Sequence, residues 1–174
     1  MDNLSKEVIT LLKRQAPALA ASLGQALQVA FACYEELSDQ KGTLSHIYVS
    51  FLLSSVLCRL PLFRIDLNDE NDLADIVPCY VEWDTPCITE HLYAQADLLA
   101  SRQYVNSRMK EYEMEQLRLR LAETYFASME AQLPLLLAQC DVASRTNIHW
   151  HYGYLYGQSF TIKEPTSGDD HALL

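Results

Sequence analysis

FRIDL, residues 63–67, is the stretch that decides the fold, because its apolar and polar side chains alternate strictly. Alternation with a period of two places the apolar side chains on one face, as in a half-buried β-strand. The polar run that follows, residues 68–72, has the composition of a tight turn. We therefore predict a strand over residues 63–67 that ends in a hairpin turn.

Two neighbouring segments extend this strand into a predicted three-stranded antiparallel meander. The β-branched and aromatic side chains of residues 45–53 suit a buried strand, but length alone leaves a buried helix equally open for residues 43–59. Residues 76–83 are the third candidate strand. Pro78 lies inside that segment and lacks an N–H for the ladder, which indicates an edge strand or a bulge.

Helical sequence precedes the meander. Apolar spacing predicts a short amphipathic helix over residues 4–15, and Pro17 suits the first turn of a second helix. Gly24 within this second helix costs about 1 kcal/mol relative to alanine, which suggests close packing. The apolar stripe of the second helix consists of Leu19, Leu23, Leu27, Ala30, Tyr34 and Leu37.

Helical sequence also follows the meander. Residues 84–86, Asp-Thr-Pro, have the capping side chain and proline of a helix start. A single helix from there to Leu133 would be roughly 70 Å long, so we predict a break near residues 104–107. Pro134 should end or kink the second piece. Its predicted buried stripe consists of Met114, Leu117, Leu121, Tyr125 and Met129.

The expected fold class is α+β, with long helices packed on a small antiparallel sheet and more helix than strand. Residues 147–162 should return to the sheet as a late strand. A chain of 174 residues with 49% hydrophobic side chains can build one core. We therefore expect a single globular domain over residues 1–162, followed by a mobile acidic tail, residues 163–174.

Charge and cysteine content narrow the functional classes. The chain has 23 acidic and 13 basic residues and a formal net charge of -10, which disfavours nucleic acid as a partner. The apolar stretch 47–57 is too short to span a membrane, which needs about 20 residues, and the N-terminus lacks the pattern of a signal peptide. Five scattered cysteines without a CxxC motif suit reduced thiols in the cytoplasm.

The most unusual segment is HWHYGYLYG, residues 149–157. In an extended chain its side chains would alternate between two faces. One face would carry the aromatic rings and could stack on a flat ligand or a protein partner; the alternative is that these rings cover the sheet against the helices. The candidate binding residues are Trp150, Tyr152, Tyr154 and Tyr156 on one face, and His149 and His151 on the other.

Other motifs for chemistry are weak. His149 and His151 lie two residues apart, but nothing in the sequence adds further ligands, so we predict no metal and no cofactor. The acidic run 66–75 departs from a calcium loop, with Asn71 at the sixth position and Val77 at the twelfth, and is better explained as a polar turn. Cys87, at a predicted helix N-terminus, is the best candidate for a reactive thiol.

Two functional classes remain open, and whether the chain is an enzyme stays undecided. The favoured class is a non-catalytic interaction or regulatory domain that binds a protein partner or a second copy of itself. Long amphipathic helices and an aromatic strand that could extend a partner's sheet support it. The alternative is a small enzyme or ligand-binding domain with a pocket near residues 149–157.

Overall fold

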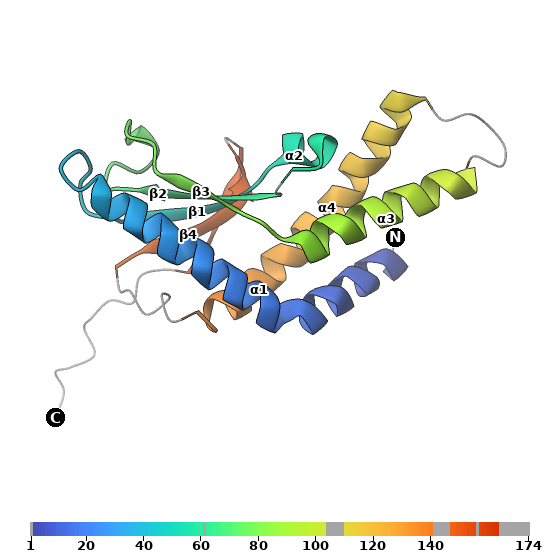
Figure 1. Cartoon of the computed structure of the whole chain (residues 1–174), viewed down its shortest axis with the longest axis horizontal. Coiled ribbons are helices and arrows are strands. Elements are labelled where there is room, and N and C mark those ends of the chain that lie inside the picture. Colours follow the sequence, from blue (N-terminus) through green and yellow to red (C-terminus); the bar gives the residue numbers. More distant parts are fainter. Residues whose placement is uncertain (1, 61, 104–109, 141–146, 156, 164–174) are drawn as a thin grey trace.

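The computed structural model describes residues 2–60, 62–103, 110–140, 147–155 and 157–163. Long helices and one small sheet make up this part of the chain (Figure 1), which confirms an α+β fold with more helix than strand. The elements are α1 (Asp2–Glu36), β1 (His46–Phe51), α2 (Leu53–Cys58), β2 (Phe63–Asn68), η1 (Asp72–Ala74, a 3₁₀ turn), β3 (Tyr80–Trp83), α3 (Pro86–Gln103), α4 (Glu111–Leu137), β4 (His149–Tyr154) and β5 (Ser159–Lys163).

The sheet has five strands in the order β3-β2-β1-β4-β5. The first three form the predicted antiparallel meander, and β4 and β5 form an antiparallel hairpin. However, β1 and β4 run parallel, so the prediction of a purely antiparallel sheet was wrong. A short hairpin forces two strands to run antiparallel, whereas α3 and α4 separate β3 from β4 and leave the direction of β4 free.

One face of the sheet is apolar and forms the core with helices α1 and α4. In β2 the burial alternates strictly, with Phe63, Ile65 and Leu67 buried, as the FRIDL pattern predicts. The segment at residues 45–53 is resolved as strand β1, followed by the short helix α2. Phe63 packs between Phe51 of β1 and Trp83 of β3, with ring centroids 5.3 and 5.1 Å away. The inner face therefore carries a continuous aromatic row.

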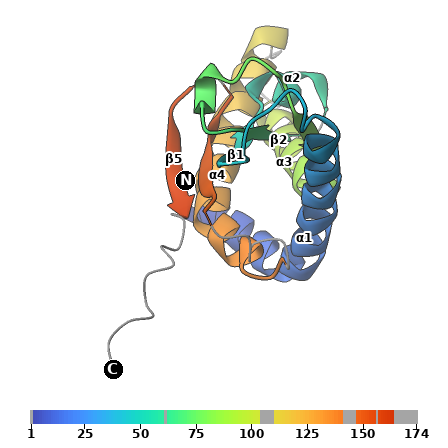
Figure 2. The ribbon, with the colours of Figure 1, turned by 90° about the vertical axis from the view of Figure 1, so that its left-hand side faces the viewer.

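The two edges of the sheet differ. Strand β3 is short and follows Pro78, as expected of an edge strand, and it packs beside α1. Strand β5 forms the opposite edge, and Figure 2 shows it on the far side of the molecule from α1. The predicted late strand is thus a hairpin, and it continues to Lys163, the first residue of the expected tail. Residues 164–174 lie outside the described residues.

Helix α1 is continuous from Asp2 to Glu36, so the prediction of two helices separated at Pro17 was wrong. Proline removes one hydrogen bond but can be accommodated by a bend, and the α1 ribbon changes direction about halfway along (Figure 1). The segment Leu4–Glu36 is long and apolar enough to cross a membrane, a test that core helices and signal sequences also pass. In this structure its predicted stripe packs in the core, with Leu19, Leu23 and Leu27 buried.

The second helical region divides as predicted. Helix α3 begins at Pro86, directly after the predicted cap, and ends at Gln103; α4 begins at Glu111. The residues of the break itself, 104–109, lie outside the described part. Pro134 does not end α4, which continues to Leu137. The later part of the predicted stripe of α4, Leu121, Tyr125 and Met129, is buried.

Two glycines offer a matched test of this packing. A Cβ at Gly24 would lie 3.9 Å from Cys140 Sγ, which is an ordinary contact. An alanine therefore fits at this position, and the packing around it does not require a glycine. A Cβ at Gly153 would lie 2.3 Å from the backbone oxygen of Gln158, which cannot move without distorting the β4–β5 hairpin. We expect G24A to raise the free energy of unfolding by about 0.5–1 kcal/mol and G153A to lower it by about 1–3 kcal/mol. Urea unfolding of both variants measures this, and equal effects would contradict it.

A buried ion pair closes one end of the sheet. Lys41 Nζ donates to Asp75 Oδ2 and to the backbone oxygen of Val77, and both charged side chains are almost fully buried. Asp75 also accepts hydrogen bonds from the backbone N–H groups of Asp69 and Val77. Burial opposes ionisation, but these hydrogen bonds outweigh it and hold the pKa of Asp75 below its usual value. The pair fixes the loop between β2 and β3 to the connection between α1 and β1.

Candidate functional site

The segment 149–154 forms strand β4, which confirms the extended conformation predicted for it. Its side chains alternate between the two faces of the sheet. Trp150 and Tyr152 point into the core, whereas His149 and His151 lie on the outer face and are half-buried. Tyr156 lies outside the described residues. The predicted candidates thus fall into an aromatic group and a histidine group with different surroundings.

The aromatic group packs against helix α4. Trp150 and Tyr152 are 1% and 0% exposed. The rings of Tyr152 and Tyr154 stack on Phe126 with centroids 4.8 and 4.1 Å away, and the Tyr152 hydroxyl donates to the Phe126 backbone oxygen at 3.1 Å. Burial raises the pKa of Tyr152 well above its ordinary value, so its phenol stays neutral. In this structure the two most buried rings cover the sheet against the helices.

The histidine group is joined by a third imidazole from β1. Strands β1 and β4 pair with His46 opposite His149, so His46, His149 and His151 lie together on the outer face; we call them the histidine cluster. The His46 ring stacks with those of His149 and His151 at centroid distances of 5.0 and 5.5 Å. His46 Nδ1 lies 3.2 Å from His151 Nε2, within hydrogen-bond distance.

Polar groups from three further positions surround the cluster. Tyr48 stacks on His151 at 4.3 Å and donates its hydroxyl to Asp72 Oδ1 at 2.7 Å. The same carboxylate oxygen lies 3.7 Å from His46 Nδ1. Thr161 of β5 brings its hydroxyl within 3.4 Å of His151 Nδ1. Burial, with the hydrogen bond to Asp72, raises the pKa of Tyr48, so its phenol remains a donor.

The relative orientation of the three imidazole rings determines which contacts they can make. The ring planes of the two pairs with His46 are nearly parallel, 13° and 18° apart, and His46 Nδ1 faces His151 Nε2 at 3.2 Å. Within the described ranges, no group of three or more His, Cys, Asp or Glu residues is arranged to hold a metal ion. The arrangement of the cluster suits hydrogen bonding and proton exchange among imidazoles.

The remaining outer face is also polar. Arg64 donates from Nε to Asp66 Oδ1 at 2.9 Å, and its guanidinium lies 3.7 Å from the centre of the Tyr80 ring. Desolvation raises the pKa of Asp66 despite the opposing effect of Arg64. This ion pair lies on β2, beyond Tyr48 from the histidine cluster.

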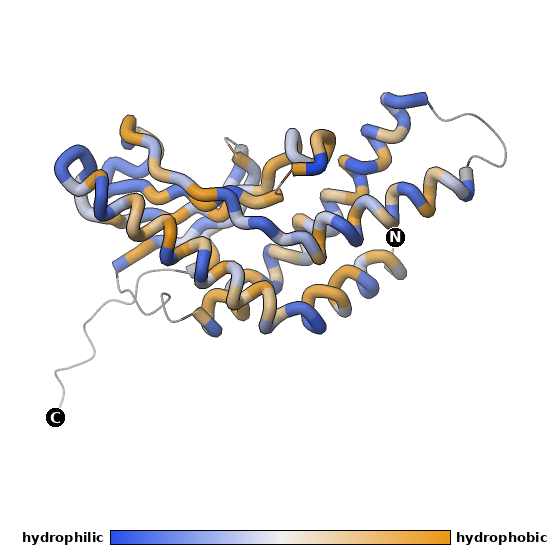
Figure 3. Tube along the Cα trace, in the orientation of Figure 1, coloured by the Kyte–Doolittle hydropathy of each residue, from blue (hydrophilic) through white to orange (hydrophobic). Residues whose placement is uncertain are grey.

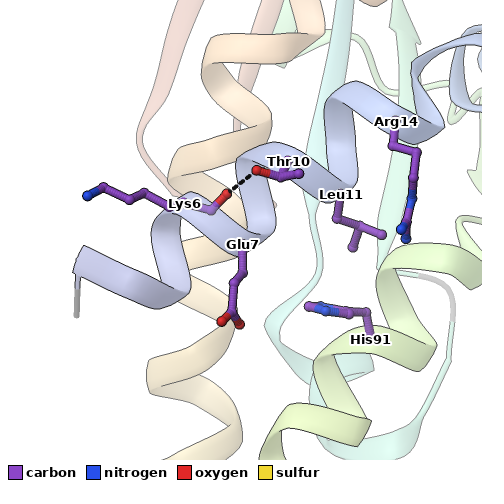
Figure 4. A pocket seen from close by; sticks show the side chains of 6 residues that line it. All are labelled: Lys6, Glu7, Thr10, Leu11, Arg14 and His91. Carbon is purple, nitrogen blue, oxygen red and sulfur yellow. Dashed lines mark hydrogen bonds between the residues drawn. The ribbon is translucent and has the colours of Figure 1, made fainter.

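A pocket lies between α1 and α3, away from the late strand. Figure 4 shows Glu7, Leu11 and Arg14 of α1 facing His91 of α3, while Lys6 points away. His91 Nδ1 lies 2.6 Å from the hydroxyl of the buried Tyr125, whose pKa is raised by burial and by the charge of Glu7. The neutral phenol therefore holds a hydrogen bond with Nδ1 and orients the imidazole.

An exposed apolar surface lies on the short helix α2 and the residues that directly follow it. Leu53, Leu57 and Leu60 are 41%, 37% and 55% exposed, and we call them the leucine surface. Leu53 and Leu57 are four residues apart and share one side of the helix, whereas Val56 faces the core. Helix α2 lies at the periphery of the molecule and carries hydrophobic colour there (Figures 1 and 3).

Two further candidates from the sequence are Cys87 and the acidic loop between β2 and β3. Cys87 is the second residue of α3, and burial raises the pKa of its thiol even though backbone N–H groups oppose this, which disfavours the reactive thiolate considered for it. The acidic loop uses its carboxylates internally: Asp69 accepts from the backbone N–H groups of Gly42 and Asn71, and Glu70 accepts from Thr43. These contacts agree with a structural polar turn.

Sequence reasoning did not place His46 in the cluster, and it missed Tyr48 and Asp72 beside it. His46 and Tyr48 do alternate at a period of two, like His149 and His151, but the sequence holds no signal that the two strands pair in parallel in this register. No protein-family model matches the chain, and comparisons with curated proteins and with solved structures found no significant match.

Proposed function

We propose that this chain is a non-catalytic interaction domain that associates with a second copy of itself through the leucine surface of α2. The observation that supports it is the exposure of Leu53 and Leu57 on α2 and of Leu60 two residues after its end. Apolar side chains that gather on the outside of a folded domain are a common feature of protein–protein contacts. Burying them against a matching surface would remove that apolar area from water.

The charges beside the leucine surface favour a second copy as the occupant. Arg59 and Asp97 lie 3.8 Å apart, and both side chains are more than half exposed. Arg59 also covers the Tyr93 ring, whose hydroxyl donates to backbone oxygens of α2 and so joins α2 to α3. In a two-fold dimer each surface meets its own copy. A patch with one cation and one anion at its margin is then complementary to itself.

The proposed dimer should be weak. A stable interface buries about 800 Å² on each partner, and three partly exposed leucines supply only part of such an area. We therefore expect a concentration-dependent equilibrium with a dissociation constant between about 1 µM and 1 mM. An acidic net charge of -10 also opposes association at low salt, so moderate salt should strengthen the dimer.

Substitution of Leu57 by lysine tests the proposal. The new ammonium would lie beside Arg59 and would have to be buried in the apolar contact, so we expect L57K to weaken dimerisation at least about tenfold. Sedimentation equilibrium of the full chain at up to 1 mM, at moderate salt, measures the change. The fold of L57K is checked by its thermal unfolding.

Leu73 provides the matched control, because it is 78% exposed but lies on η1. L73K should dimerise like the unmodified chain. If the unmodified chain stays monomeric at 1 mM, self-association is excluded. If L73K and not L57K dissociates the dimer, the interface lies at η1 and the assignment to α2 is wrong.

We also propose a cytoplasmic location. Its support is the cysteine content of the sequence, five scattered cysteines without a CxxC motif, which suits a reducing compartment. The interaction proposal does not depend on this location.

A further inference from the structure

We propose that His46 and His151 form a one-proton site that fastens the η1 turn to the outer face of the sheet as the pH falls. The site is separate from the leucine surface, so it does not rest on the proposed dimer. It combines two imidazole nitrogens at hydrogen-bond distance, a carboxylate beside them, and a turn whose backbone is held in an unfavourable conformation.

The distance between the two imidazoles sets the number of protons. His46 Nδ1 and His151 Nε2 lie 3.2 Å apart, so one nitrogen must donate and the other must accept. One added proton preserves this contact as a charge-assisted hydrogen bond. A second proton would place two N–H donors against each other and two cations on neighbouring strands. The two imidazoles together therefore accommodate one added proton and not two.

Asp72 is positioned to compensate that charge. Its Oδ1 lies 3.7 Å from His46 Nδ1 and accepts a hydrogen bond from the Tyr48 hydroxyl. While His46 is neutral, only the Tyr48 hydrogen bond fastens Asp72 among these contacts. A proton on His46 adds an ion pair between β1 and η1. Histidine is the side chain that ordinarily changes charge between pH 5 and 8.

Described groups on three strands face the pair. On β4, His149 stacks on His46 and would oppose the charge if it also became protonated. On β5, Thr161 contributes a neutral hydroxyl to His151. On β2, Asp66 is opposite Tyr48 and already binds Arg64, while His46 is opposite the neutral Asn68. Among these described neighbours, Asp72 is the carboxylate that contacts His46.

The backbone of η1 has an unfavourable conformation at Asp72 that depends on supporting contacts. Asp72 has φ 55°, in the left-handed region that non-glycine residues adopt at a cost. Such a conformation persists when surrounding contacts hold it, and the contacts to Tyr48 and His46 do so here. Losing them would let the turn relax. The loop base is anchored independently by Lys41 and Asp75, so release would be confined to the turn.

Amide hydrogen exchange on the full chain tests the proposal. The amides of Asp72, Ala74 and Asp75 donate to backbone oxygens within the turn and report on its opening. After correction for the intrinsic pH dependence, we expect their exchange to slow about two- to fivefold between pH 8 and pH 6, as for a partly exposed ion pair. The pH-dependent slowing should disappear in H46Q, and also in D72N, which keeps an acceptor for Tyr48 but has no charge.

H91Q is the matched control, since His91 lies on α3, and it should retain the full slowing. An exchange rate in the unmodified chain that does not change with pH would overturn the proposal, and so would loss of the response in H91Q. A response that vanishes with EDTA would assign the cluster to a metal and overturn it as well. The monomeric L57K variant should keep the response, so failure of the dimer and failure of the proton site can be told apart.

Discussion

Replacing Lys41 by methionine is expected to lower the free energy of unfolding by about 3–5 kcal/mol, the usual effect of removing one partner from a buried ion pair. Methionine preserves the length of the side chain but leaves the buried carboxylate of Asp75 without its cation. It also removes the donor to the backbone oxygen of Val77. Chemical denaturation at pH 7 measures the loss, with K13M as the control at an exposed position.

The effect of K41M should depend on pH. The folded-state pKa of Asp75 is lowered, so its ionisation stabilises the fold above the pH at which an unfolded aspartate titrates, near 4. This stabilisation is lost as the pH falls through the lower pKa of the folded protein. The difference between K41M and the unmodified chain should therefore be full at pH 7 and shrink below about pH 4. A loss under 1 kcal/mol at pH 7 would show that the pair is dispensable.

Replacing Tyr152 by alanine is expected to cost about 3–5 kcal/mol, as for other large aromatic side chains deleted from a core. The side chain is fully buried, stacks on Phe126 and donates to a backbone oxygen of α4, so its removal leaves a cavity between sheet and helix. Thermal or urea unfolding measures the loss. Y112A, at an exposed position of α4, should change stability by less than about 1 kcal/mol.

The Tyr152 result also separates the two roles considered for the aromatic group. A ring held for ligand binding is commonly exposed, and its removal would leave stability nearly unchanged. A small effect of Y152A, comparable to that of Y112A, would therefore contradict the packing described here. The Y152F variant isolates the hydroxyl and should cost about 1 kcal/mol.

Local patterns predicted much of the fold. The alternation in residues 63–67 placed β2 and its buried face, and the Asp-Thr-Pro sequence placed the start of α3, because strand periodicity and helix capping depend on neighbouring residues. Pro78 correctly indicated an edge strand. Pro17 was misread, since a proline inside a helix removes one hydrogen bond, and packing of the stripe on both sides of it outweighs that loss.

The site could be predicted only in part. Alternation was enough to place His149 and His151 on one face and Trp150 and Tyr152 on the other. It could not add His46, because this requires the parallel register of two strands separated by α2, α3 and α4. Nor could it add Asp72, whose position depends on the conformation of a turn. Contacts between distant segments are set by the assembled core, which a local pattern does not contain.

The parallel pairing of β1 with β4 has a consequence for how the polypeptide acquires its structure on the ribosome. Strand β1 lies in the middle of the sheet, yet one of its two neighbours, β4, is synthesised only after α2, β2, β3, α3 and α4. Until then β1 exposes an unpaired hydrogen-bonding edge, which is a template for wrong pairing. Closing the sheet also joins segments distant in sequence, a topology that folds slowly. Chains stalled before β4 should therefore depend on chaperones more than chains that already contain β4.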